Sequence, residues 1–314
     1  MQVRAFMFGS AAPSSYVAAQ ALIDIPIVRF LGFCWSPPQR TSLKECVGRL
    51  IGSERILSTP RSRGRAPSVP LFDRNDLGTV QIFLERERPD LILSCGFPKL
   101  IPNPVLELAQ HAINIHPGLL PQRAGGTPVR WAVRLGDSEY GVTAHYMTDR
   151  FDAGDIVFQE TMPLPPDTTT GEAEAALDPH VARIVGSIVR KIERGEALNR
   201  KSQVAEASMP SLRGHRQFVD WQADDAASIR RLCNAMRPRS GALARSGART
   251  IVLWDVEPGG VRSAQCAAGT VSDVGPEGPT IATRGGSMVV RKALIGGRVR
   301  AGAMLKLHVG DQLS

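Results

Sequence analysis

The stretch "AINIHPGLLP" at residues 112–121 holds the feature on which both the fold and the site depend. Its first five residues form an apolar run typical of a buried strand, yet the run carries Asn114 and His116. Side chains two residues apart in a strand point to the same face of a sheet. Pro117 cannot continue the ladder of backbone hydrogen bonds. We therefore predict a strand over 112–116 that ends with Asn114 and His116 side by side.

Strands and helices alternate along the chain on either side of this stretch. Three further apolar runs predict buried strands, at residues 3–9, 27–35 and 90–96. The periodic segments between and after these runs predict helices, at residues 14–23, 77–88, 104–110 and 128–135. Asn103 is the expected N-cap of the third helix, while Thr127 and Gly136 bound the fourth. The alternation predicts a parallel α/β sheet covered by helices.

The pattern changes after residue 136. The runs "GVTAHYM" at 141–147 and "DIVFQETM" at 155–162 predict a hairpin or a pair of edge strands. A helix covering residues 180–194 is expected next, with its start at Pro179.

The last third of the chain has a different composition. One helix is predicted near residues 224–236, and short strands separated by glycine follow it, which is typical of a small β-barrel. A chain of 314 residues suits two domains. We therefore expect an α/β domain over residues 1–205 and a β-barrel domain over residues 206–314.

Composition excludes several classes of protein. No apolar stretch approaches the roughly 20 residues of a membrane span, so we expect no membrane partner. The five cysteines are odd in number, scattered and never in a C-x-x-C pair, so no disulfide framework is indicated. We therefore expect the protein in the reducing cytoplasm. The six histidines show no metal-ligand spacing, so no metal is expected. Neither a G-x-G-x-x-G nor a P-loop motif is present, so no dinucleotide or nucleoside triphosphate site is indicated.

The net charge of +8 is concentrated in the C-terminal part of the chain. Residues 206–314 hold 15 Lys/Arg against 9 Asp/Glu, a net +6, which leaves +2 for the rest. A basic domain fits a phosphate-bearing partner such as tRNA, and it equally serves solubility. Region 36–70 contains Arg61, Arg63 and Arg65, and it can be interpreted either as a basic insertion that binds tRNA or as a solvated loop. We favour the loop.

A carboxamide beside an imidazole suits attack on a carbonyl group. The amide can hold the developing oxyanion, and a neutral imidazole can take a proton from the nucleophile. In open α/β sheets such sites lie at the carboxyl ends of strands. The alternative is that Asn114 caps a turn and His116 is a core histidine; the pair by itself leaves both interpretations open.

A second segment favours the chemical interpretation. In "TDRFDAGDIVFQ" (148–159), Asp152 could orient His116 and favour its charged form, while Gly154 lets the backbone approach a ligand closely. An ordinary Asx-rich loop is the alternative for this turn.

Taken in order, "INIHPGLLPQRAGGTPVRWAV", "GVTAHYM" and "FDAGDIVFQ" resemble the folate-dependent formyltransferase family. The pattern of that family reads Asn-x-His-Pro-Ser-Leu-Leu-Pro, an Arg-Gly turn, Gly-Val-Thr and Asp-x-Gly-Asp. The resemblance is strong over roughly residues 90–165 and weak over the first 30. The C-terminal part is similar to the small barrel that methionyl-tRNA formyltransferases and some amino-sugar formyltransferases carry after the catalytic domain.

The resemblance implies a fold, a site and a cosubstrate. The fold would be a Rossmann-like formyltransferase domain followed by an OB-like β-barrel. Asn114, His116 and Asp152 match the catalytic triplet, and 10-formyltetrahydrofolate is the implied formyl donor. Its pterin is expected to lie against the backbone of two segments, whose residues are Gly96, Phe97, Leu100, Ile101, Arg150, Phe151, Gly154 and Asp155.

Departures from the family pattern bear on the acceptor. Ala124 occupies the arginine position of the usual turn, and "GVTAHYM" is closer to the small-molecule members than to the methionyl-tRNA enzymes. We therefore predict a formyltransferase that acts on a primary amine of a small molecule, such as an amino sugar or a biosynthetic intermediate. Methionyl-tRNA is the alternative acceptor. A formyltetrahydrofolate hydrolase and a non-catalytic folate-binding protein are less favoured alternatives. The sequence does not decide the oligomeric state, and a homodimer is one of the options.

Overall fold

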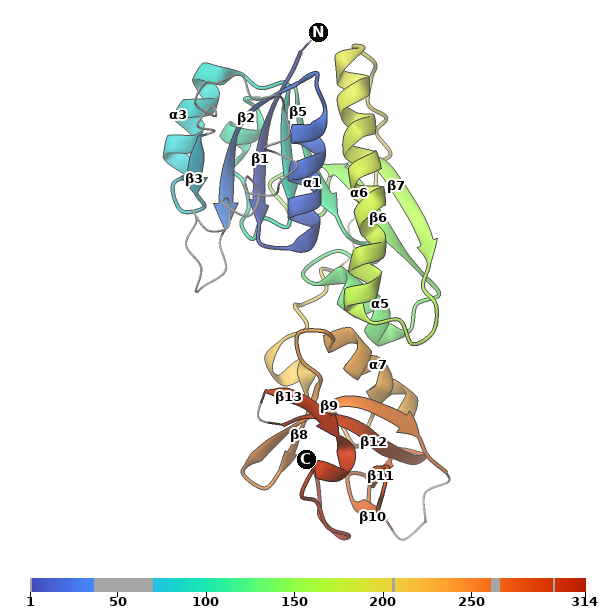
Figure 1. Cartoon of the computed structure of the whole chain (residues 1–314). Coiled ribbons are helices and arrows are strands. Elements are labelled where there is room, and N and C mark those ends of the chain that lie inside the picture. The colour runs from blue at the N-terminus through green and yellow to red at the C-terminus, as the bar shows by residue number, and fades with distance from the viewer. Residues whose placement is uncertain (1, 37–69, 205–206, 261–265, 296) are drawn as a thin grey trace. The chain divides into compact units, whose positions relative to one another are not determined.

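The structure is a computed structural model that describes residues 2–36, 70–204, 207–260, 266–295 and 297–314. Region 36–70, with Arg61, Arg63 and Arg65, lies almost entirely outside the described residues. The chain forms two compact units (Figure 1). The first unit comprises Met1–Ala124, Gly141–Thr161 and Glu174–Ser208, and the second comprises Gly125–Tyr140, Met162–Ala173 and Met209–Ser314.

A seven-stranded sheet of order β3-β2-β1-β4-β5-β6-β7 forms the centre of the first unit. Its strands are β1 Val3–Ser10, β2 Val28–Ser36, β3 Leu71–Asp73, β4 Leu91–Cys95, β5 His111–His116, β6 Glu139–Tyr146 and β7 Ile156–Pro163. The first five strands pair in parallel, which confirms the predicted sheet, whereas β6 runs antiparallel to β5. The strands predicted around 141–147 and 155–162 are present as β6 and β7.

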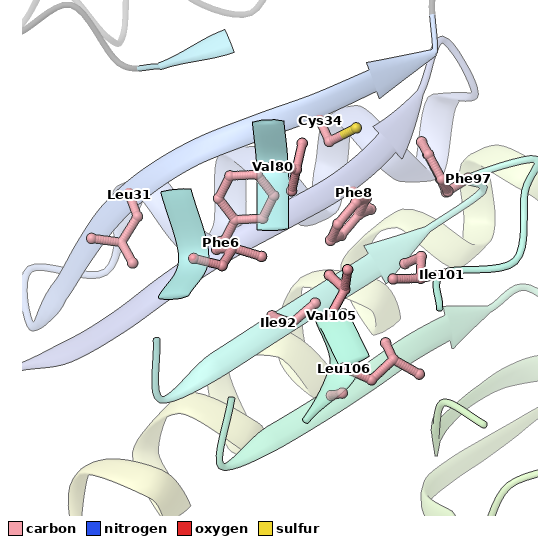
Figure 2. Close-up of a cluster of buried hydrophobic side chains, with 12 residues drawn as sticks. Phe6, Phe8, Leu31, Cys34, Val80, Ile92, Phe97, Ile101, Val105 and Leu106 are labelled. Atoms are coloured by element: carbon pink, nitrogen blue, oxygen red, sulfur yellow. The ribbon is translucent and has the colours of Figure 1, made fainter. Parts of the chain in front are cut away.

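Helices cover the sheet, and α1 and α6 lie on the viewer's side of it in Figure 1. The helices of this unit are α1 Pro13–Asp24, α3 Leu77–Glu87, α4 Asn103–Leu106 and α6 Thr170–Glu193. Side chains from the sheet, α3 and α4 form one apolar cluster, drawn in Figure 2. Within it, the ring of Phe8 contacts the rings of Phe6 and Phe97 at centroid distances of 5.3 and 5.2 Å.

Both predicted boundaries of helix α4 are wrong. Helix α4 ends at Leu106, not at residue 110, because the following amides, of Leu108 and Ala109, bond to carbonyls only three residues back. Its N-cap is Pro102, not Asn103.

Helix α6 begins ten residues before its predicted range and contains Pro179 inside it. Thr169 and Glu172 form a reciprocal capping box, in which the Glu172 amide donates to Thr169 Oγ1 at 3.3 Å and Glu172 Oε2 accepts from the Thr169 amide at 2.8 Å. This cap starts the helix upstream, so the proline is not its first residue.

The second unit contains an antiparallel sheet of order β10-β11-β12-β9-β8, with β13 paired to β12. Its strands are β8 Ala242–Ser246, β9 Arg249–Pro258, β10 Val271–Gly275, β11 Gly278–Thr283, β12 Gly286–Ile295 and β13 Arg298–Ala301. Isolated bridges join Gln312 to Thr270, directly before β10, and Leu313 to Ser246 at the end of β8. The end of the chain thus links the two edges of the sheet, as the predicted barrel requires.

Two helices pack together in this unit, α5 Pro128–Leu135 and α7 Ala226–Met236. Both were expected from the sequence, and Gly136 ends α5 as predicted; the structure shows it in the left-handed conformation. Asp224 joins them, because its Oδ1 accepts from Arg134 Nη2 at 2.5 Å and from Ser228 Oγ at 2.8 Å. The segment Gly125–Tyr140 therefore groups with the C-terminal unit, while the division at residue 205 stays a prediction.

None of the helices in the described ranges combines the length and the apolar character needed to cross a membrane.

We expect Asp224→Ala to destabilise the second unit by about 3–5 kcal/mol, because the partly buried Arg134 guanidinium loses its carboxylate partner. Hydrogen exchange should show faster exchange of the amides of α5 and α7 and little change in β1 to β5. Asp273→Ala, the same substitution at an exposed position on β10, is the matched control. Unchanged protection of α5 in Asp224→Ala would contradict the grouping of α5 with the C-terminal unit.

Candidate functional site

Strand β5 presents Asn114 and His116 on one face at its carboxyl end, as the sequence predicts. The antiparallel register with β6 sets Asn114 opposite His145 and His116 opposite Thr143. Two pairs of polar side chains therefore lie next to each other on neighbouring strands. His116 and His145 are both buried.

Asp152 reaches this group from the loop between β6 and β7. Its Oδ1 lies 3.3 Å from His116 Nδ1 and 3.5 Å from His145 Nε2. All three side chains are less than 10% exposed, at 9% for Asp152, 6% for His116 and 3% for His145. One buried carboxylate thus faces two imidazole rings, and the structure brings the three predicted catalytic residues together.

The hydrogen bonds of His145 fix its tautomer. Nδ1 lies 2.8 Å from the carbonyl oxygen of Tyr146, to which it can only donate. In the neutral ring Nε2 is then an acceptor, and it lies 3.1 Å from Asn114 Nδ2. This contact determines which way the Asn114 carboxamide is turned. His145 therefore orients Asn114, while its Nε2 lies 3.5 Å from Asp152 Oδ1.

Both ring nitrogens of His116 also have partners. Nε2 donates to the carbonyl oxygen of Arg123 at 2.8 Å, while Nδ1 faces Asp152. A neutral ring protonated on Nε2 would turn the lone pair of Nδ1 toward a carboxylate oxygen. The imidazolium form donates at both positions, so the geometry suits the charged ring that forms once His116 has taken up a proton.

The loop that carries Arg123 is held by the hydroxyl group of Thr143. Thr143 Oγ1 accepts from the Leu120 amide at 3.2 Å and donates to the Gly118 carbonyl at 2.7 Å. Gln159 Nε2 donates to the same hydroxyl at 3.0 Å and to the Leu120 carbonyl at 2.9 Å. Strands β6 and β7 thus fix the chain that follows His116.

The Asp-x-Gly spacing has a steric reason. A Cβ atom added at Gly154 would lie 2.0 Å from the Tyr146 carbonyl oxygen, which His145 uses as an acceptor. Asp152 itself has a φ of 54°, in the left-handed region that non-glycine residues adopt at some cost. The turn is therefore built around one tight approach and one strained residue.

Cys95, at the end of β4, is not suited to act as a nucleophile. Burial raises the pKa of its thiol to about 11, against smaller opposing effects of Ser14 and Ser15. A thiol with so high a pKa stays protonated near neutral pH, and the thiolate is the reactive form. The chemistry therefore falls to the carboxamide, the imidazoles and the carboxylate.

Comparison with known proteins identifies the family. The family model described as "Formyl transferase" matches residues 74–184, and the model "Formyl transferase, C-terminal domain" matches residues 212–304. A methionyl-tRNA formyltransferase of Moorella thermoacetica is 31% identical over 246 residues, which cover 76% of this chain and 77% of the relative. The chain belongs to the formyl transferase family.

Other methionyl-tRNA formyltransferases match this formyl transferase over shorter spans. The protein of Geotalea uraniireducens is 28% identical over 72% of this chain and 70% of its own length. That of Burkholderia pseudomallei is 32% identical over 206 residues, which make up 64% of this chain and 62% of the relative. Family membership confirms the predicted folate-dependent formyl-transfer enzyme.

Solved structures confirm the fold of this formyl transferase. HypX of Aquifex aeolicus, solved in complex with tetrahydrofolic acid, has a TM-score of 0.60 at 18% identity, covering 92% of this chain and 43% of that chain. A 4-N formyltransferase of Francisella tularensis has a TM-score of 0.56 at 17% identity, over 76% of this chain and 91% of that chain.

The residues predicted to bind folate divide into two kinds. The side chains of Phe97 and Ile101 are buried in the apolar cluster (Figure 2), whereas Leu100 and Phe151 are exposed although they are apolar. Buried anchors leave the backbone of the 96–101 segment at the surface. Of the other predicted residues, Gly96 and Arg150 are exposed and Asp155 is partly buried, whereas Gly154 is buried.

The two predicted folate segments share one face of the sheet. Met147, two residues before the second segment, packs against the same apolar cluster as Phe97, Ile101 and Ala112. Ala112 is two residues before Asn114, so this is also the face that carries Asn114 and His116. The exposed apolar side chains of Leu100 and Phe151 fit a flat aromatic ring system, so the residues present suit a pterin.

The residue that sequence reasoning missed is His145. The signal was present in "GVTAHYM", where Thr143 and His145 are two residues apart in a strand, like Asn114 and His116 in β5. Only the pairing of β5 with β6 shows that these two pairs lie opposite each other.

We expect His145→Phe to slow formyl transfer roughly 10- to 100-fold, the loss that follows when reacting groups are misplaced by about 1 Å. The substituted side chain is still a planar aromatic ring, but it has no nitrogen to bond Asn114 or to face Asp152. Steady-state kinetics and thermal unfolding should be measured together. His180→Phe, which removes an imidazole that contacts Glu160, is the matched control. Wild-type turnover in His145→Phe would show that Asn114 needs no such partner.

Proposed function

We propose that this enzyme transfers the formyl group of 10-formyltetrahydrofolate to a primary amine. The observation that carries the proposal is the Asp152 carboxylate, set between His116 and His145 with Asn114 beside them. These groups combine a carboxamide donor, a proton-exchanging imidazole and a buried negative charge. This set suits acyl transfer to an amine.

The roles of the residues follow from their contacts. The nitrogen of the acceptor amine attacks the formyl carbon, and an amide hydrogen of Asn114 stabilises the negative charge that develops on the formyl oxygen. His116 exchanges the proton that the amine loses and N10 of the folate gains as its bond to the formyl carbon breaks. Asp152 stabilises the charged form of the His116 ring during this exchange.

The donor site is proposed at the two segments beside the triplet. Leu100 and Phe151 would contact the faces of the pterin, and the backbone next to Gly96 and Gly154 would bond its polar edge. When bound there, 10-formyltetrahydrofolate supplies the activated formyl group. The Aquifex HypX structure with tetrahydrofolic acid supports this proposal through its shared fold.

Methionyl-tRNA is the acceptor that the comparisons support best. The relatives at 28–32% identity are methionyl-tRNA formyltransferases, and the chain includes a matched C-terminal domain. This supports the alternative acceptor better than the small amine that the sequence favoured. The excess of positive charge in residues 206–314 is consistent with a polyanionic acceptor.

One observation keeps the small amine as a second candidate. Ala124 stands in place of the family arginine and is buried against Leu120 and Ile156. A buried methyl group offers no positive charge to a phosphate at this point of the site. The binding of an acceptor with few phosphates is not weakened by the replacement of arginine by alanine.

We expect Asn114→Ala and His116→Ala each to slow transfer about 100-fold or more, the usual loss when an oxyanion donor or a general base is removed. Asp152→Asn should also lower turnover and move the histidine limb of the pH–rate profile to lower pH, because the imidazolium loses its negative neighbour. The measurement is kcat over the pH range 5–9. Asn75→Ala and His180→Ala are matched controls at other positions. Near-wild-type rates in either alanine variant would return Asn114 and His116 to structural roles.

For the acceptor, we expect the enzyme to formylate methionyl-tRNA. Its affinity for the tRNA should fall by orders of magnitude between about 50 and 200 mM salt, because contacts with phosphates dominate such binding and salt screens them. The assay compares charged initiator tRNA with amino sugars and amino-acid-derived amines at several salt concentrations. Turnover of a small amine with a shallow salt slope, and none of methionyl-tRNA, would replace the first acceptor by the second. Formate release without any acceptor would indicate a hydrolase.

A further inference from the structure

A short segment after helix α6 is tied to the turn that carries Asp152. Lys201 and Ile156 exchange two backbone hydrogen bonds, of 2.8 and 2.9 Å, at the start of β7. Ser202 Oγ donates to Asp155 Oδ1 at 3.1 Å. The segment is therefore aligned antiparallel to the chain that leaves the turn.

Gln203, the next residue, holds the turn itself. Its Nε2 donates to the carbonyl oxygen of Asp152 at 3.1 Å and to that of Gly154 at 2.6 Å. Both partners are acceptors, so only the NH₂ end of the carboxamide can face them, and the orientation of the amide is fixed. One side chain thus bonds the backbone on both sides of Ala153.

This double hydrogen bond acts on a strained residue. Asp152 has a φ of 54°, a conformation that persists only where the surroundings enforce it. The side chain of Asp152 must leave this backbone at a fixed angle for its Oδ1 to lie 3.3 Å from His116 Nδ1 and 3.5 Å from His145 Nε2. A rotation of the turn would change both distances together.

We propose that Gln203 is a positioning residue for formyl transfer, which holds the Asp152 turn so that its carboxylate faces both imidazoles. The inference rests on the catalytic role proposed for Asp152. Gln203 acts only through the backbone of the turn, from a position 51 residues further along the chain.

The decisive variant is Gln203→Met, which keeps the length of the side chain and removes both hydrogen bonds. Its kcat should fall about tenfold or more, because the carboxylate is no longer held within a fraction of an ångström of its position. The histidine limb of the pH–rate profile should move to lower pH, in the direction expected for Asp152→Asn. Gln81→Met, at a glutamine of α3 that bonds Glu85, is the matched control.

Gln203→Glu provides a second test, because it keeps the shape of the side chain but turns a carboxylate oxygen toward two carbonyl oxygens. Its kcat should fall further than that of Gln203→Met. Thermal unfolding of each variant separates a local effect from a loss of the fold. A lower kcat with an unmoved pH profile in both variants would mean a merely structural role and overturn the proposal.

Asp152→Asn is measured alongside, so that the two proposals can fail separately. If Asp152→Asn is impaired while both Gln203 variants match the wild type, the positioning role is wrong and the proposed function stands. If Asp152→Asn itself keeps its rate and its pH profile, the role of Asp152 fails, and the role of Gln203 fails with it.

Discussion

A buried carboxylate that faces two imidazole rings is the interaction on which the site depends. Removing a charge from water costs several kcal/mol unless partners compensate for it. Asp152 has such a partner in the almost fully buried His116, whose imidazolium form can donate to the carboxylate from Nδ1 across 3.3 Å. The turn that carries this carboxylate includes the tight approach at Gly154 and the left-handed backbone of Asp152.

The sheet supplies the geometry on which that contact relies. Because β6 runs antiparallel to β5, one register places Asn114 opposite His145 and His116 opposite Thr143. Each pair has a separate task. The first orients the carboxamide, while Thr143 and Gln159 fix the loop whose Arg123 carbonyl meets His116. A one-residue slip of β6 would turn all of these side chains to the other face.

The chemistry and the acceptor are encoded in different parts of the molecule. The triplet lies within the first unit, where the family pattern is densest. The features that bear on the proposed acceptor lie outside the triplet: the positive charge of residues 206–314 and the buried methyl group of Ala124. These two features favour different acceptors, so formyl transfer is supported more strongly than any one substrate.

The sequence by itself determined what is local. Strand period two was enough to place Asn114 and His116 on one face, and Pro128 and Gly136 bounded α5 correctly. Local rules failed where two local signals competed. Pro179 indicated the start of helix α6, but the capping box of Thr169 and Glu172 starts the helix upstream of the proline. Only the tertiary structure decided that His145 faces Asn114 and that Gln203 bonds the Asp152 turn. Such contacts depend on which strands pair and in what register, and the residues of one strand do not specify the strand with which it pairs.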